Sequence, residues 1–152
     1  LFGDGAGAAV ITACEEDGAM MMKCDGSRGD VLTCAAGSTL LMNGQEVFKF
    51  AVRSVPEAIT EVLDQMKLAK EDVDYYILHQ ANRRIVESVA KRLGEPMSKF
   101  PMNLDEYGNT SSASIPLLLD QLYREGKIHK GNRLIMAGFG AGLSWGATYT
   151  TV

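Results

Sequence analysis

One predicted helix in this chain contains the run Ile115-Pro116-Leu117-Leu118-Leu119, which is apolar at every position. Five residues at about 100° each pass completely round a helix axis, so no polar side remains to face water. A helix that is apolar all round is buried on all sides. A domain of 152 residues built on a single sheet gives little reason for such burial. The run therefore predicts a helix that lies between two sheets.

The remaining sequence alternates between strand-like and helix-like segments. Apolar residues at three- and four-residue spacing predict a helix over residues 48–66, and Pro56 should kink or break it because proline lacks a backbone donor. We expect two more helices, at 83–93, ending at Gly94, and at 111–124. The expected strands are residues 8–13, 19–23, 73–78, 100–104, 134–137 and 145–152, and residues 25–44 should form a loop.

From residue 19 onward the order is β-α-β-α-β-α-β-β, which predicts an α/β fold. Such alternation is typical of a mainly parallel sheet with helices on both faces. The last two strands are joined only by residues 138–142, so they should pair antiparallel and make the five-stranded sheet mixed.

Composition excludes several classes of function. Hydrophobic residues make up 46% of the chain, which indicates a globular protein. The net charge of −4 argues against nucleic acid as a partner, and we expect no membrane span and no signal peptide. Cys14, Cys24 and Cys34 are odd in number and unpaired in spacing, so we expect neither a metal site nor a disulfide framework. A reducing compartment fits this pattern.

The glycine-rich segment of residues 3–7 suggests a phosphate loop only weakly, because no strand precedes it and a strand pattern follows it. Close packing of the backbone is the better interpretation of these glycines. The chain also begins without Met, inside an apolar run, and we expect it to be part of something longer.

Two polar residues stand where a strand pattern gives way to a helix pattern. His79 lies in His79-Gln80-Ala81-Asn82, and Asn109 lies in Gly108-Asn109-Thr110-Ser111. Such junctions collect binding and catalytic groups in α/β proteins. A neutral His and an Asn can both donate hydrogen bonds to a developing oxyanion. A structural His and a helix-capping Asn are the alternatives. We expect the two side chains to converge, with polar atoms within roughly 5 Å of each other.

Four segments together resemble β-ketoacyl-[acyl-carrier-protein] synthase III. They are residues 1–10, 79–85, 108–111 and 138–146, which occur in the family's order. The resemblance covers nearly the whole chain and weakens at residues 14–41. It implies the thiolase-like fold, in which two similar α/β halves stack with buried helices in the middle. Residues 1–14 would be the last strand of a missing N-terminal half, and residues 15–152 the C-terminal domain.

The resemblance implies a cytoplasmic acyltransferase that starts type II fatty-acid synthesis. An acyl group from acyl-CoA is loaded onto a cysteine and is then condensed with malonyl-acyl carrier protein. The family's two enolate-stabilising donors fall on His79 and Asn109, and a backbone N–H of its second oxyanion hole falls on Ala141. The nucleophilic cysteine would lie in the missing half, so the chain by itself should be inactive. The resemblance implies no cofactor beyond the coenzyme A thioester substrate, and a homodimer for the whole protein.

The family's binding surfaces can be carried over in the same way. Its pantetheine tunnel falls on five positions: Met42, Gly44, Phe48, Ala81 and Asn82. Its contact with the acidic carrier protein falls on Arg84, and Lys49, Lys91 and Arg92 would extend that basic face. His129 should be an ordinary surface residue.

Three alternatives stay open. The chain could belong to a related condensing acyltransferase of polyketide type, or to a non-catalytic domain that only binds a carrier protein. It could also be a cysteine hydrolase with a Cys-His-Asn set. In a hydrolase the Asn109 side chain would bond directly to the His79 ring and orient it.

Overall fold

The computed structural model describes residues 2–13, 15 and 17–152. Its main sheet has four strands in the order β1-β6-β5-β4, and a separate two-stranded sheet pairs β2 with β3. The strands are β1 Ala19–Cys24, β2 Leu32–Thr33, β3 Leu41–Met42, β4 Tyr75–Leu78, β5 Arg133–Gly140 and β6 Ser144–Thr151. The α-helices are α1 Gly44–Met66, α2 Arg83–Leu93, α3 Leu104–Tyr107 and α4 Ser114–Arg124. Short 3₁₀ turns are η1 Gly26–Val31, η2 Lys70–Asp72, η3 Met97–Lys99 and η4 Ser111–Ala113.

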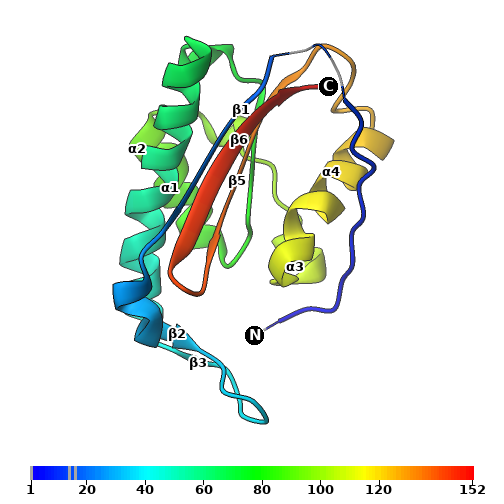
Figure 1. Cartoon of the computed structure of the whole chain (residues 1–152). Coiled ribbons are helices and arrows are strands. Elements are labelled where there is room, and N and C mark those ends of the chain that lie inside the picture. Colours follow the sequence, from blue (N-terminus) through cyan, green and yellow to red (C-terminus); the bar gives the residue numbers. More distant parts are fainter. Residues whose placement is uncertain (1, 14, 16) are drawn as a thin grey trace.

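Helices cover both faces of the main sheet (Figure 1). α1 and α2 lie on one face, and α4 lies on the other. Because side chains alternate along a strand, β4 sends Tyr76 and Leu78 into the core beneath α1 and α2, and sends Ile77 toward Leu118 and Leu122 of α4. The expected arrangement of helices on both faces is confirmed.

The sheet is less parallel than expected. Only β4 and β5 pair in parallel, whereas β5 with β6 and β6 with β1 are antiparallel. The antiparallel pairing predicted for the last two strands is confirmed. The main sheet has four strands rather than five because the strand predicted at residues 100–104 does not form. Pro101 has no N–H to give to a ladder, and Phe100 instead stacks on Tyr76 with ring centroids 4.7 Å apart.

The predicted strand at residues 8–13 is also wrong for this chain. These residues have no regular secondary structure and are exposed. A strand needs a partner, and this segment runs beside α4 rather than along an edge of the sheet (Figure 1). The glycines before it serve close packing, as the sequence suggested. A Cβ on Gly3 would come within 1.9 Å of the Tyr107 carbonyl oxygen, and one on Gly7 within 2.4 Å of Pro116.

Two other predictions about local structure need correction. Residues 25–44 are more than a loop, because β2 and β3 form a small hairpin within them. α1 starts earlier than predicted and is unbroken through Pro56. Proline leaves the carbonyl of Val52 without its usual helical donor, and Arg92 Nη1 from α2 donates to that oxygen at 3.4 Å. The neighbouring helix thus supplies the bond that Pro56 lacks.

α2 matches its prediction from first residue to last. Asn82 caps its start by accepting the Ile85 N–H at 3.0 Å, and Gly94 ends it in the left-handed conformation at φ 72°. Both signals are local, which is why they can be read from the sequence.

α4 is buried on one side only. Leu118 and Leu122 are buried, whereas Ile115, Pro116, Leu117 and Leu119 are half-buried. The expectation of burial on all sides is therefore not met within this chain.

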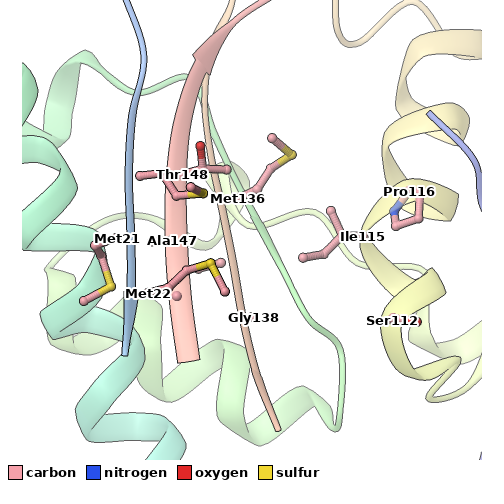
Figure 2. A pocket seen from close by; sticks show the side chains of 12 residues that line it. Met21, Met22, Ser112, Ile115, Pro116, Met136, Gly138, Ala147 and Thr148 are labelled. Atoms are coloured by element: carbon pink, nitrogen blue, oxygen red, sulfur yellow. The ribbon is translucent and has the colours of Figure 1, made fainter. Parts of the chain in front are cut away.

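An apolar groove of about 440 Å³ separates α4 from the β1–β6 part of the sheet. It is lined by Met20, Met21, Met22, Ser112, Ile115, Pro116, Met136, Ala137, Gly138, Gly146, Ala147 and Thr148. In Figure 2, Ile115 and Pro116 of α4 face Met136 and Thr148 of the sheet across this groove. Met20 and Met22 are 65% and 77% exposed beside it. This face of the sheet is only half covered.

We predict that the chain self-associates through this groove, because an exposed apolar patch of this kind is uncommon on a stable monomer. Sedimentation at micromolar concentration should show a dimer or larger species. Met20→Lys with Met22→Lys should shift the chain toward monomer, because both lysines would charge the groove.

The control is Glu57→Lys, an exposed position on α1 at the opposite face, which should leave the association unchanged. A compact wild-type monomer with one cooperative unfolding transition would show that the groove needs no cover.

Candidate active site

His79 directly follows β4, and the parallel ladder fixes its backbone. Its N–H donates to the Ala137 carbonyl of β5 at 2.8 Å, which continues the β4–β5 pairing by one residue. The side-chain alternation of β4 then turns His79 to the same face as Ile77, the face that α4 covers.

His79 lines a cavity of about 340 Å³ between the sheet and the start of α4. Its other lining residues are Ser111, Ser112, Ser114, Ile115, Gly138 and Phe139. None of the lining residues is an Asp, Glu, Lys or Arg. Ser112, Ile115 and Gly138 also line the apolar groove, so the cavity and the groove adjoin.

The imidazole of His79 is held from two sides. Its Nδ1 lies 2.7 Å from Oγ of Ser114, and its ring meets the Phe139 ring edge-on with centroids 5.2 Å apart. Burial lowers the pKa of His79 because it disfavours the charged imidazolium, while the Ser111 backbone carbonyl opposes this by raising the pKa. The cavity therefore favours a neutral His79.

Asn109 lies at the turn that leads into η4. Its Oδ1 accepts the Ser111 N–H at 3.0 Å, and its backbone carbonyl accepts the Gly3 N–H at 2.9 Å. Ser111 has a positive φ of 54°, a conformation that non-glycine residues adopt at some cost and that is common near functional sites. Asn109 is not among the residues that line the His79 cavity. The convergence of the two side chains stays a prediction.

The contacts of the two residues bear on the hydrolase alternative. Among the described residues, the side-chain partner of the His79 ring is Ser114 and that of the Asn109 amide oxygen is the Ser111 backbone. The direct Asn109–His79 bond that a Cys-His-Asn hydrolase needs is therefore not formed.

Sequence reasoning missed a buried amide network next to His79. Gln80, which is 1% exposed, donates from Nε2 to Asn103 Oδ1 at 2.8 Å and accepts the Asn103 N–H at 2.9 Å. Asn103 Nδ2 then donates to Gln121 Oε1 of α4 at 2.8 Å. The network ties the end of β4 to α4 and to the segment that carries Asn109. The only sequence signal was Gln80 at the end of an apolar strand.

Ala141 lies in the turn between β5 and β6. The non-glycine residues with positive φ in the described chain are Lys67 and Ser111. Ala141 therefore has a backbone conformation that alanine adopts without strain. Its assignment to an oxyanion hole stays a prediction.

The five positions assigned to a pantetheine tunnel differ in their exposure and in their contacts. Met42, the last residue of β3, and Gly44, the first of α1, are exposed, and Ala81 is half-buried against the main core. Asn82 serves as the cap of α2, the alternative role of such a residue. Phe48 is half-buried, and its ring centroid lies 5.7 Å from the guanidinium carbon of Arg84. The structure thus brings Phe48 and Arg84 together.

The basic residues assigned to carrier-protein docking differ in how free they are. Lys49 pairs with Glu46 at 2.9 Å, and Arg92 lies 3.9 Å from Glu57. Arg84 is exposed and rests on an aromatic ring rather than on a carboxylate. Lys91 is exposed near the end of α2. Among the described residues, the ion pairs thus involve Lys49 and Arg92 but neither Arg84 nor Lys91.

Cys24 and Cys34 are exposed, and neither lines the His79 cavity. Cys14 lies outside the described residues. Among those residues we find no group of three or more His, Cys, Asp or Glu side chains that could hold a metal ion. The described helices include none that is long and apolar enough to cross a membrane.

The chain is similar to known proteins over nearly its whole length. Residues 63–152 match the family described as 3-oxoacyl-[acyl-carrier-protein (ACP)] synthase III C terminal. A β-ketoacyl-[acyl-carrier-protein] synthase III of Synechococcus is 46% identical over 97% of this chain and 49% of its own length. One from Clostridium perfringens is 46% identical over 97% of this chain and 51% of its own length.

A solved structure gives the same result for the fold. The crystal structure of 3-oxoacyl-[acyl-carrier-protein] synthase III from Aquifex aeolicus has a TM-score of 0.88 and 38% identity, and it aligns over 93% of this chain and 47% of its own length. The thiolase-like α/β fold is confirmed, although with four strands in the described sheet. The chain spans about half the length of the curated relatives it matches. The chain therefore belongs to the 3-oxoacyl-[acyl-carrier-protein] synthase III family, and its matched region is the family's C-terminal domain.

Proposed function

We propose that this chain supplies the enolate-stabilising half of a condensing enzyme. The observation that carries the proposal is His79, held neutral by burial in a cavity lined by no acidic or basic side chain. A neutral imidazole donates a hydrogen bond to a developing oxyanion without also binding the carboxylate that must leave.

The reaction proposed for the whole protein has two half-reactions, which are acyl transfer to a cysteine and decarboxylative condensation. A cysteine thiol attacks the acyl-CoA thioester, and coenzyme A leaves as its thiol. The C–C bond of malonyl-acyl carrier protein then breaks, carbon dioxide leaves, and the electron pair becomes an enolate. The enolate carbon attacks the acyl-cysteine thioester, which expels the thiolate, and that thiolate takes up a proton. The product is a 3-oxoacyl-acyl carrier protein.

In this scheme His79 and the Nδ2 of Asn109 donate to the enolate oxygen. The Oδ1 of Asn109 accepts the Ser111 N–H, and the Nδ2 of the same amide therefore points away from that hydrogen bond. The backbone N–H of Ala141 contributes to a second oxyanion hole at the acyl-enzyme step.

The cysteine is proposed to come from the part of the protein that this chain does not span. Neither Cys24 nor Cys34 lines the cavity, and the apolar groove that adjoins the cavity is open to receive another structural unit. Residues 8–13 would then pair with a strand of that unit, which accounts for their exposure here. The chain alone is proposed to be inactive.

Arg84 is proposed to dock the acidic carrier protein, with Lys49, Lys91 and Arg92 around it. Phe48 lies under Arg84, so the pantetheine arm would enter past the start of α1, near Met42, Gly44, Ala81 and Asn82. The cytoplasmic location and the homodimer of the whole protein stay predictions, and the starter acyl-CoA is left open. A polyketide-type condensing enzyme would use the same cavity.

In the full-length enzyme, His79→Ala or Asn109→Ala should slow condensation by on the order of 10²–10³, the usual effect of losing one oxyanion donor. Transfer of the acyl group from acyl-CoA to the cysteine should be affected less, because no enolate forms in that step. Both half-reactions can be followed with a radiolabelled acyl group. Equal losses in the two steps would contradict a role in decarboxylation.

Arg84→Glu in the full-length enzyme should raise KM for malonyl-acyl carrier protein several-fold at low salt, with acyl-CoA loading nearly unchanged. The effect should shrink at high salt, because exposed charges are screened. Arg124→Glu, at an exposed residue near the end of α4, is the matched control. If both variants show the wild-type KM, the docking surface lies elsewhere.

A further inference from the structure

Ser114 is a buried hydroxyl whose partner is a candidate catalytic residue. It is the first residue of α4, is 3% exposed, and has its Oγ 2.7 Å from Nδ1 of His79. Thirty-five positions separate the two residues in sequence. A serine at a helix start usually serves the helix itself, but the side-chain contact recorded for Ser114 is with the imidazole.

The direction of this hydrogen bond decides which nitrogen of His79 carries the proton. A neutral imidazole has one N–H donor and one bare acceptor nitrogen, and a hydroxyl can bond to either. If Ser114 donates to Nδ1, the proton is on Nε2. If Ser114 accepts from Nδ1, then Nε2 is bare and can only accept.

Few other contacts could set the tautomer. The Phe139 ring meets the imidazole edge-on, with ring centroids 5.2 Å apart, and offers no hydrogen-bonding group to either nitrogen. The Ser111 backbone carbonyl lies near the imidazole and raises the pKa of His79, and it also accepts the backbone N–H of Ser114. A carbonyl oxygen has two lone pairs, so it competes with the Ser114 hydroxyl as a partner for an imidazole N–H. The Ser114 hydroxyl is the side-chain group within hydrogen-bond distance of Nδ1, and its direction of donation differs between the two tautomers.

We propose that Ser114 is a positioning residue that donates its hydroxyl proton to Nδ1 of His79 and so keeps the imidazole proton on Nε2. The use of that Nε2–H toward an oxyanion rests on the proposed function, whereas the tautomer itself does not. The opposite tautomer would present a bare nitrogen, which suits a general base and cannot stabilise an enolate oxygen.

The test is NMR of the chain with ¹⁵N-labelled histidine rings, at a pH where His79 is neutral. The chain has two histidines, so a His129→Gln variant assigns the signals. Two-bond ¹H–¹⁵N correlations distinguish the two tautomers. In the wild type we expect the proton on Nε2. In Ser114→Ala the ratio of Nε2–H to Nδ1–H should fall about 2- to 10-fold, the range that one neutral hydrogen bond is worth.

Two controls separate tautomer selection from general damage. Ser114→Thr keeps the hydroxyl and should retain the wild-type ratio, and Ser112→Ala removes a hydroxyl of the same cavity that has no recorded bond to His79. Backbone amide spectra identify any variant that fails to fold, and if Ser114→Ala does not fold, the tautomer of the wild type still tests the proposal. A wild-type proton on Nδ1, or an unchanged ratio in folded Ser114→Ala, would overturn the proposal.

The result of the tautomer measurement does not depend on whether the proposed function is correct. Normal condensation by His79→Ala in the full-length enzyme would count against the oxyanion role alone. The tautomer measured in Ser114→Ala would still decide what the hydroxyl does.

Discussion

The parallel pairing of β4 with β5 is the constraint on which the candidate site depends. The ladder continues one residue beyond β4, where the His79 N–H bonds to the Ala137 carbonyl. That bond fixes the backbone, and strand alternation sends His79 toward α4 and the next residue, Gln80, into the amide network. His79 and Gln80 therefore have different roles, although they are neighbours in the sequence. One faces the cavity, and the other ties the end of the strand to Asn103.

The amide network gives a physical reason for a rigid cavity. A buried amide that lacks a partner costs free energy, so the paired bonds between Gln80 and Asn103 hold the segment before α3 against the strand. The bond from Asn103 to Gln121 extends the same restraint to α4, whose first residue contacts His79. The position of His79 relative to Ser114 is thus fixed from both the sheet and the helix.

What could be predicted from the sequence was mainly local. The span of α2 follows from its Asn82 cap, its apolar face and Gly94, and each of these signals lies within a few residues of the helix. Residues 8–13 and 100–104 have the composition of strands, but a strand also needs a partner, and composition does not reveal one. Pro56 was expected to kink or break α1, and the compensating bond from Arg92 comes from another helix.

The same distinction applies to the site. His79 and Asn109 could be selected because each stands at a recognisable junction, whereas Ser114 and Gln80 acquire their importance from partners 35 and 23 positions away. The half-covered apolar groove beside the cavity was visible in advance only as an unusually apolar helix.

Burial should keep His79 neutral, and titration of its imidazole by NMR of the ring-labelled chain measures this. We predict a pKa below the usual value of about 6.5, because the cavity disfavours the charged imidazolium more than the Ser111 carbonyl favours it. His79 would then be a neutral donor at pH 7 and above, and would gain a proton only as the pH falls below about 6.5. A pKa above that value would mean that His79 is stabilised as a cation, and would contradict the role proposed for it.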